Sequence, residues 1–169
     1  MKQFKTLLIA VALILGATSF ASAQTKVAHI ATQELIEQMP TYKAAMNQLE
    51  KLQKTYDTEI KDMVTEAQNT MKRYESEAQT KTDEENQKRA TELQQTQRTI
   101  GEYRQNAMQE LQKKEMELLK PVLEKARATI QKVARAKGYD YVLDSTTGTG
   151  VIMADGYDLM PDVKKDLGI

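Results

Sequence analysis

The chain has 169 residues, a length for which one structural domain is expected. Charged residues make up 28% of the chain and aromatic residues 5%, and there is no tryptophan or cysteine. This composition suits solvated helices better than a large core. The lack of cysteine excludes disulfides, thiol catalysis and a lipid-modified N-terminal cysteine. Basic and acidic residues number 24 each, and this balance gives no indication of nucleic-acid binding.

Residues 1–23 are predicted to be a cleaved signal peptide. Lys2 and Lys5 precede a mainly apolar run that is too short to span a bilayer comfortably. The Ala-Ser-Ala motif at 21–23 fits the small-x-small cleavage rule, so the mature chain is expected to start at Gln24 with a net charge of −2. An uncleaved membrane anchor is the alternative. We expect a periplasmic or secreted protein.

The segment 24–40 is predicted to hold one strand and one short helix. Residues 26–31 have the composition of a buried strand. Thr32 is a candidate N-cap for a helix over 33–39. Pro40 is expected to end that helix and to redirect the chain into a much longer one.

The helical pattern that follows runs to about residue 136. Its part over residues 41–121 is predicted to be a long antiparallel helical hairpin, or tentacle, that extends from the rest of the chain. Over 42–78 the apolar residues recur every 3.6 residues on average, which is the period of an α-helix. A second arm repeats the pattern. Thr82 and Glu85 form a capping-box pattern that places a turn between the arms. One continuous helix is the alternative.

A hairpin of this length is too thin to have a core of its own. Each arm has about 40 residues, or roughly 60 Å at 1.5 Å per residue, and two helices alone bury little surface. We therefore expect the hairpin to protrude from a body and to need copies of itself. Between Asp83 and Thr99 only Ala90 and Leu93 are apolar, which predicts a loosely held tip.

Gly101 is the predicted hinge of the hairpin. It lies inside the second arm, where glycine costs about 1 kcal/mol relative to alanine. Folding the chain near residue 81 places Gly101 opposite Asp62 and Met63. We expect the arm to flex at this point.

Residues 122–169 are predicted to form, with 24–40, a β-rich body for oligomerisation. Strands are expected at 139–143 and 151–154, and a last helix at 161–167. The N-terminal strand must meet the two later strands. Three short strands leave unpaired edges, so the body is expected to be assembled from several chains. The fold class is α+β, predominantly α. The side chains expected to build this body are Val27, Ile30, Leu35, Leu119, Leu123, Val142, Leu143, Val151 and Ile152.

No catalytic, metal or cofactor site is predicted, and an enzyme is not the expected function. Gly148 and Gly150 lie in a loop that lacks the Gly-Lys-Ser/Thr ending of a phosphate-binding loop. His29 is the single histidine, and its apolar strand neighbours predict a packed residue. One histidine without cysteine forms no metal site.

Side chains in the arms are the candidate residues for binding other proteins. At helical spacing a methionine ordinarily packs between the arms, but methionine-rich surfaces also adapt to varied partners. Met108 and Met116 are the stronger candidates because they lie in a second apolar row off the main stripe. The candidate residues are Met63, Val64, Met71, Met108 and Met116.

Several segments together resemble the Skp (OmpH-like) family of periplasmic chaperones. They are Lys-Val-Ala-His-Ile at 26–30, Gln-Glu-Leu-Ile-Glu-Gln-Met-Pro at 33–40, the charged hairpin, and Gly-Tyr-Asp-Tyr-Val-Leu-Asp at 138–144. The tail over 151–159 is similar as well, so the resemblance covers the whole mature chain. It implies a homotrimer in which strands form a central body and three hairpins surround a cavity. That cavity would hold unfolded outer-membrane proteins without ATP or any cofactor.

The chain departs from the family pattern in two ways. The best-known members are strongly basic, whereas the mature chain is slightly acidic, so contact with a membrane surface or lipopolysaccharide is not expected. The family often has a hydroxyl residue before its last helix, where this chain has Met160, and Asp158 is the substitute acceptor that we expect. The leading functional hypothesis is an ATP-independent periplasmic holdase, and a structural coiled-coil spacer or scaffold of the cell envelope is the alternative.

Overall fold

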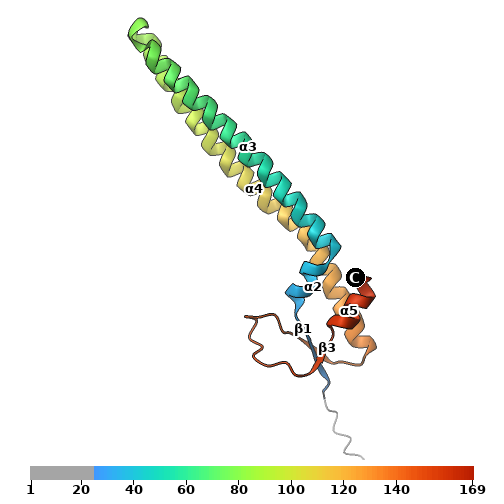
Figure 1. Ribbon diagram of the computed structural model, residues 1–169. Coiled ribbons are helices and arrows are strands. Elements are labelled where there is room, and N and C mark those ends of the chain that lie inside the picture. Colours follow the sequence, from blue (N-terminus) through green and yellow to red (C-terminus); the bar gives the residue numbers. More distant parts are fainter. Residues whose placement is uncertain (1–24) are drawn as a thin grey trace, which may run out of the picture.

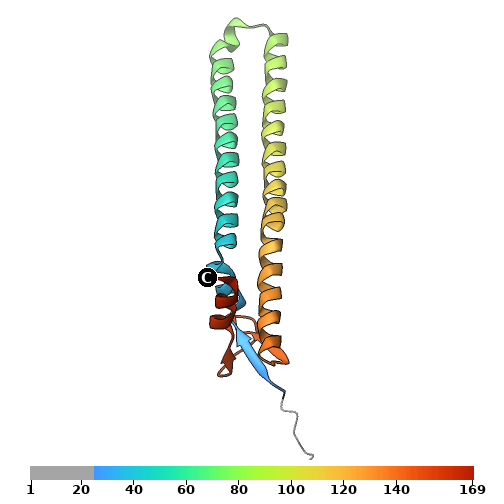
Figure 2. The same cartoon turned by 90° about the vertical axis from the view of Figure 1, so that its right-hand side faces the viewer.

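The computed structural model describes residues 25–169, so the predicted signal peptide lies outside the described residues. Two long helices run side by side away from a small body that contains both ends of the described chain (Figures 1 and 2). The elements in chain order are β1 (Val27–Ile30), α2 (Thr32–Gln38), α3 (Pro40–Glu77), the short 3-10 helix η1 (Ala78–Thr80), α4 (Asp83–Ala136), β2 (Tyr141–Asp144), β3 (Tyr157–Asp158) and α5 (Met160–Leu167). The predicted fold class and the antiparallel hairpin are confirmed.

The turn of the hairpin is built by the capping box predicted from the sequence. The backbone N–H of Glu85 donates to the Thr82 hydroxyl at 3.2 Å, and the Thr82 N–H donates to the Glu85 carboxylate at 3.1 Å. Asp83, Glu84 and Glu85 place three acidic groups in the positive first turn of α4. Helix α4 therefore starts anew at residue 83 instead of continuing α3.

Helix α4 extends from the tip of the hairpin into the body without interruption. It passes through Pro121, which lies inside the helix, and ends at Ala136. Gly138 follows with φ of +74°, the left-handed conformation that glycine adopts readily at the end of a helix. The boundary predicted between hairpin and body thus falls within one continuous helix.

The body contains a three-stranded parallel sheet in the order β2-β1-β3. Val27 pairs with Tyr141 and Ile30 with Asp144, while Ala28 pairs with Tyr157. The N-terminal strand therefore lies between two C-terminal strands, and its expected pairing with the C-terminal part of the chain is confirmed. The strand predicted at 151–154 is wrong, because that segment has no regular structure and the third strand is β3.

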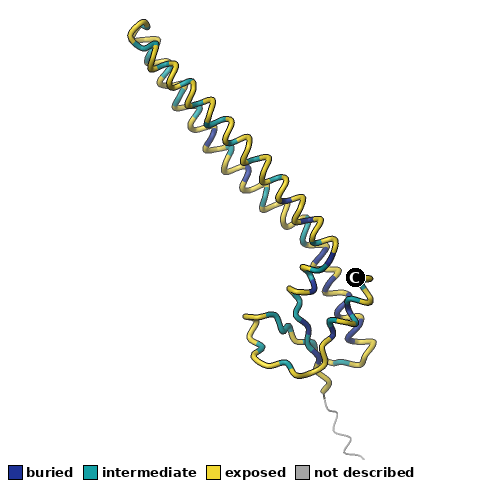
Figure 3. Tube along the Cα trace, viewed as in Figure 1, coloured by how far each residue is buried: buried dark blue, intermediate teal, exposed yellow. Residues whose placement is uncertain are grey.

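The apolar core lies between one face of the sheet and three helices. Ala28 and Ile30 of β1 pack against the C-terminal part of α4, and α2 and α5 close the remaining sides. Figure 3 shows this buried cluster in the body, with scattered buried positions along the hairpin. The largest fully buried side chains are Ile30, Leu35, Met39, Leu159 and Val163.

The start of α2 differs from the prediction. Ala31 occupies the N-cap position and Thr32 is the first helical residue, so Thr32 does not cap the helix. Its N–H instead donates to the Asp144 carboxylate at 3.2 Å, and the N–H of Gln33 donates to the Thr146 hydroxyl at 3.2 Å. Groups more than 100 residues away along the chain satisfy the free N–H groups of α2, which local sequence could not reveal.

Helix α5 begins at Met160, one residue before the predicted start, and Asp158 is the expected acceptor at this end of the helix. The Asp158 carboxylate accepts a hydrogen bond from the Met160 N–H at 2.8 Å, in place of a hydroxyl cap. Two ion pairs then hold α5 in place. Lys132 of α4 contacts Asp166 at 2.7 Å, and Lys137, the residue after α4, contacts Asp162 at 3.0 Å.

Candidate functional site

The sheet of the body is covered on one face only. Side chains alternate between the faces of a strand, so Ala28 and Ile30 point to the helices while Val27 points away from them. Tyr141 and Leu143, in register with Val27 and His29, lie on the same outer face. Val27 is 44%, Tyr141 60% and Leu143 46% exposed. We call these three residues the uncovered sheet face.

The predicted body residues fall into three groups. Ile30 and Leu35 are fully buried within one chain, so they are core residues that a second copy does not reach in this conformation. Leu119, Val142 and Val151 are half-buried. The exposed members of the set, available to another surface, are Val27, Leu123, Leu143 and Ile152.

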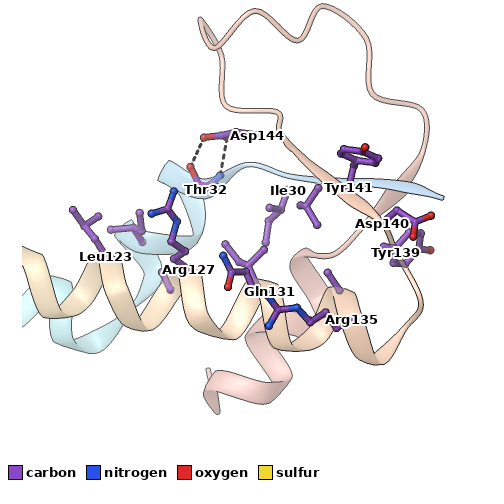
Figure 4. A pocket seen from close by; sticks show the side chains of 15 residues that line it. Ile30, Thr32, Leu123, Arg127, Gln131, Arg135, Tyr139, Asp140, Tyr141 and Asp144 are labelled. Carbon is purple, nitrogen blue, oxygen red and sulfur yellow. Dashed lines mark hydrogen bonds between the residues drawn. The ribbon is translucent and has the colours of Figure 1, made fainter. Parts of the chain in front are cut away.

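A groove of about 640 Å³ runs between α4 and the edge of the sheet formed by β2 (Figure 4). Leu123, Arg127 and Arg135 line it from α4, and Tyr141 lines it from β2. Within residues 25–169 neither arginine makes an ion pair. The groove therefore adds apolar surface beside the uncovered sheet face, together with two arginines and the carboxylates of Asp140 and Asp144.

Asp144 holds the end of β2 against α2 at the rim of this groove. Its carboxylate accepts the Thr32 hydroxyl at 2.5 Å and the Thr146 hydroxyl at 2.6 Å, in addition to the N–H groups of both residues. Burial raises the pKa of Asp144, but the hydrogen bonds from Thr146 and Thr32 favour the anion more strongly and bring the pKa to about 2.

His29 lies on the outer face of β1, where it is half-buried. Its Nδ1 atom is 3.1 Å from the Ser145 hydroxyl oxygen. Among the described residues no group of three His, Cys, Asp or Glu side chains is placed to hold a metal ion. Nor does any helix within 25–169 combine the length and apolar character that a membrane span requires.

The five candidate client-binding residues occupy two different environments in the arms. Met108 and Met116 on α4 are 63% and 67% exposed, so neither is used for packing between the arms. Met63 and Val64 on α3 are half-buried, and Met71 is 39% exposed. Val64 and Met71 line a groove between the two helices, whereas Met63 lines a different one.

Aromatic contacts join the arms at mid-length. The rings of Tyr56 and Tyr103 meet edge to face, with 6.2 Å between centroids. The Tyr103 hydroxyl donates to the Glu59 carboxylate, and this hydrogen bond raises the pKa of Tyr103 to about 12. These pairs agree with the alignment of the arms expected from a turn near residue 81.

Polar contacts join the two arms at the tip of the hairpin, where apolar residues are few. Arg89 contacts the Glu77 carboxylate at 2.6 Å and lies 4.5 Å from the centre of the Tyr74 ring. The Tyr74 hydroxyl donates to Glu92 at 2.9 Å. An ion pair, a cation–π contact and a hydrogen bond therefore replace apolar packing. We call these four residues the tip cluster.

Gly101 lies within the regular helix α4 and has no positive φ. A Cβ atom added at this position would meet no atom within 4 Å. Its conformation thus does not require glycine, and its role as a hinge stays a prediction.

Comparison with known proteins places this architecture in a family. The family model described as outer membrane protein (OmpH-like) matches residues 26–167. The chain belongs to the OmpH-like family. The match spans the body and both arms.

Relatives of the OmpH-like chain include the chaperone protein Skp of Photorhabdus luminescens and that of Photorhabdus laumondii subsp. laumondii. Each is 27% identical over 125 residues, which is 74% of this chain and 76% of the relative. A solved structure of an OmpH-like protein from Caulobacter crescentus CB15 has a TM-score of 0.76 at 20% identity. The alignment covers 87% of this chain and 86% of that one. This likeness confirms the fold.

Proposed function

We propose that the mature chain is an ATP-independent holdase chaperone of the periplasm that surrounds unfolded outer-membrane proteins as a homotrimer. Membership of the OmpH-like family, with relatives named as chaperones, supports a chaperone of outer-membrane proteins. The observation that carries the proposal is the form of the molecule, a long arm with exposed methionines on a body whose sheet lacks a second covering layer.

The uncovered sheet face supports self-association. Parallel sheets are normally covered on both faces, and in this parallel sheet Val27, Tyr141 and Leu143 remain exposed on one face. Copies of the same chain would cover these side chains and carry several arms from one body. Leu143→Asp should therefore weaken assembly of the homotrimer. Ile169→Asp is the matched control, because Ile169 is 37% exposed and follows α5, which packs on the helix-covered side of the sheet.

The exposed methionines support binding of varied unfolded chains. Methionine is flexible and polarizable, so one surface accepts many client side chains. Several arms that each make weak contacts bind a client through multivalency, and release follows from mass action without ATP. Export to the periplasm follows from the predicted signal peptide and from the resemblance to the family.

The structural spacer is the second candidate function. The unbroken 54-residue helix α4 favours it, since a continuous helix paired along its length forms a rod. A spacer would assemble through the same body but would leave unfolded proteins free to aggregate.

The refolding of an unfolded β-barrel membrane protein separates the two functions. The protein is diluted from urea with the mature chain, without nucleotide, while light scattering is recorded. The holdase predicts suppressed scattering that added ATP does not change. Unchanged scattering from a folded, assembled chain would contradict the holdase and leave the spacer.

The double variant Met108→Gln and Met116→Gln tests the contact surface in the same assay. It should suppress scattering less well than the parent, because it removes two apolar side chains that point away from the arm pairing. Met153→Gln is the control, since Met153 is 76% exposed on the body instead of the arms. Equal suppression by both variants would show that these methionines do not contact the client.

A further inference from the structure

We propose that each arm carries a discrete binding groove for an extended client segment, which accepts two alternate apolar side chains and a neighbouring carboxylate. The inference rests on the proposed chaperone function and specifies what the arm recognises. The groove lies between α3 and α4 and has a volume of about 340 Å³. We call it the arm groove. Its apolar lining consists of Val64, Ala67, Met71, Leu93 and Ile100.

The dimensions of the arm groove match the repeat of an extended chain. Val64 and Met71 are seven residues apart on one helix, which is about 10 Å at 1.5 Å per residue. Side chains on one face of a strand recur every two residues, or about 6.6 Å. Two such side chains fit along the groove, while the residue between them faces solvent.

The charge of the arm groove favours a client segment with an acidic residue next to its two apolar side chains. Arg104 lines the groove, and no acidic residue does. Within 25–169 Arg104 makes no ion pair. Two other grooves of the arms differ in this respect, because Asp62 and Glu66 line one and Glu92 lines the other. A client carboxylate beside the apolar pair would therefore meet an unopposed cation here.

Polar side chains of the lining suit the backbone of such a segment. Gln68 and Gln97 are exposed members of the groove, and their amides both donate and accept hydrogen bonds. An extended segment presents unpaired N–H and C=O groups. Strands of outer-membrane barrels alternate apolar and polar residues, so an unfolded barrel protein supplies many segments with this pattern.

Labelled peptides test the arm groove by fluorescence anisotropy. The probe is a strand-like peptide of about ten residues with alternating leucines and serines and one glutamate. One control peptide has the same composition with its leucines in a single block, and a second has glutamine for glutamate. The alternating glutamate peptide should bind the mature chain more tightly than either control. Equal affinity for the alternating and block peptides would overturn the proposal.

Arginine variants test the position of the carboxylate. Arg104→Gln should weaken binding of the glutamate peptide by about three- to fivefold, the effect of one exposed ion pair, and leave the glutamine peptide unaffected. Arg98→Gln is the control, because Arg98 is exposed on α4 outside the groove. Equal losses in the two variants would refute a role for Arg104.

A methionine pair tests the apolar lining. Met71→Gln should weaken binding of both alternating peptides. Met46→Gln should not, because Met46 is 42% exposed on the same helix, α3, and lies outside the groove. Circular dichroism confirms that each variant keeps its helix content. The parent chain could suppress client aggregation while all peptides bind with equal affinity to the parent and to every variant. That result would refute the arm groove as a binding site but leave the chaperone function standing. If the parent fails to suppress aggregation, the proposed function itself fails.

Discussion

Replacement of Asp144 by asparagine should loosen the attachment of α2 to the sheet. The carboxylate accepts hydrogen bonds from the N–H and hydroxyl groups of both Thr32 and Thr146. Thr146 in turn accepts the N–H of Gln33. Asparagine keeps the shape of the side chain but has a neutral oxygen and presents amide hydrogens to one of the threonines. The variant therefore weakens a network that spans β2, the following loop and the start of α2.

The size of the effect follows from the pKa of Asp144. The pKa is about 2 in the folded chain against an ordinary value of 3.8. Each pKa unit corresponds to about 1.4 kcal/mol, and partial exposure of the group reduces the total, so we expect a contribution of about 1–2 kcal/mol. Because folding lowers the pKa, this stability is present above pH 4 and is lost as the pH falls toward 2.

Urea unfolding at one fixed protein concentration measures this contribution. Asp144→Asn should lower the free energy of unfolding by about 1–2 kcal/mol at pH 7, and the gap to the parent should narrow below pH 4. Asp155→Asn serves as the control, because Asp155 is an exposed loop aspartate. If Asp144→Asn lost no more than this control, or if its deficit did not change with pH, the network would not have the assigned role.

Three further predictions concern the arms. Gly101→Ala should raise the free energy of unfolding by about 0.5–1 kcal/mol per chain, measured by thermal melting. No gain in stability would show that the helix at this point is already optimal. If flexing at Gly101 matters, the variant should also hold large clients less well than small ones. Arg89→Gln should speed hydrogen exchange around Tyr74 and Glu77 without affecting the body, and unchanged exchange would show that the tip cluster contributes nothing. Affinity for an unfolded outer-membrane protein should persist from low salt to about 0.15 M, because the chain predicted to remain after signal-peptide cleavage has a net charge of only −2. A collapse in affinity over this range would show that the contacts are mainly ionic.

The hairpin could be predicted from the sequence because its determinants are local. The apolar period sets the helices, and Thr82 with Glu85 sets the turn through groups three residues apart. The same holds for Gly138, whose positive φ ends α4. Asp158 at the start of α5 is also local, since it acts on the N–H two residues later.

The parts of the structure that differed from the sequence-based prediction depend on contacts between segments that are distant along the chain. Residues 151–154 have strand composition but no partner in one chain, and Ile152 is fully exposed. Strand preference largely reflects packing on a half-buried surface, which this segment lacks here. Thr32 is a good cap by type, yet Asp144 satisfies its N–H from across the body. At the tip, Arg89 stabilises Tyr74 through charge, which a count of apolar residues does not register.

For the candidate binding site, the sequence could predict which residues are suited to contacts but not how the fold groups them. Sequence periodicity could separate Met108 and Met116 from the main stripe, and the structure shows both exposed. It could not reveal that Val64 lines one groove and Met63 another, because the grooves form only when two helices meet. Ile30 and Leu35 had the apolar character of contact residues but are buried within the chain.

Native mass spectrometry of the mature chain, alone and with an unfolded outer-membrane protein, tests the central claim most directly. We predict a trimer in the absence of client and a complex of three chains with one client molecule in its presence. Leu143→Asp should shift the free chain toward monomers and reduce this complex. A folded monomer at micromolar concentration, or a trimer that forms no complex with the client, would contradict the account.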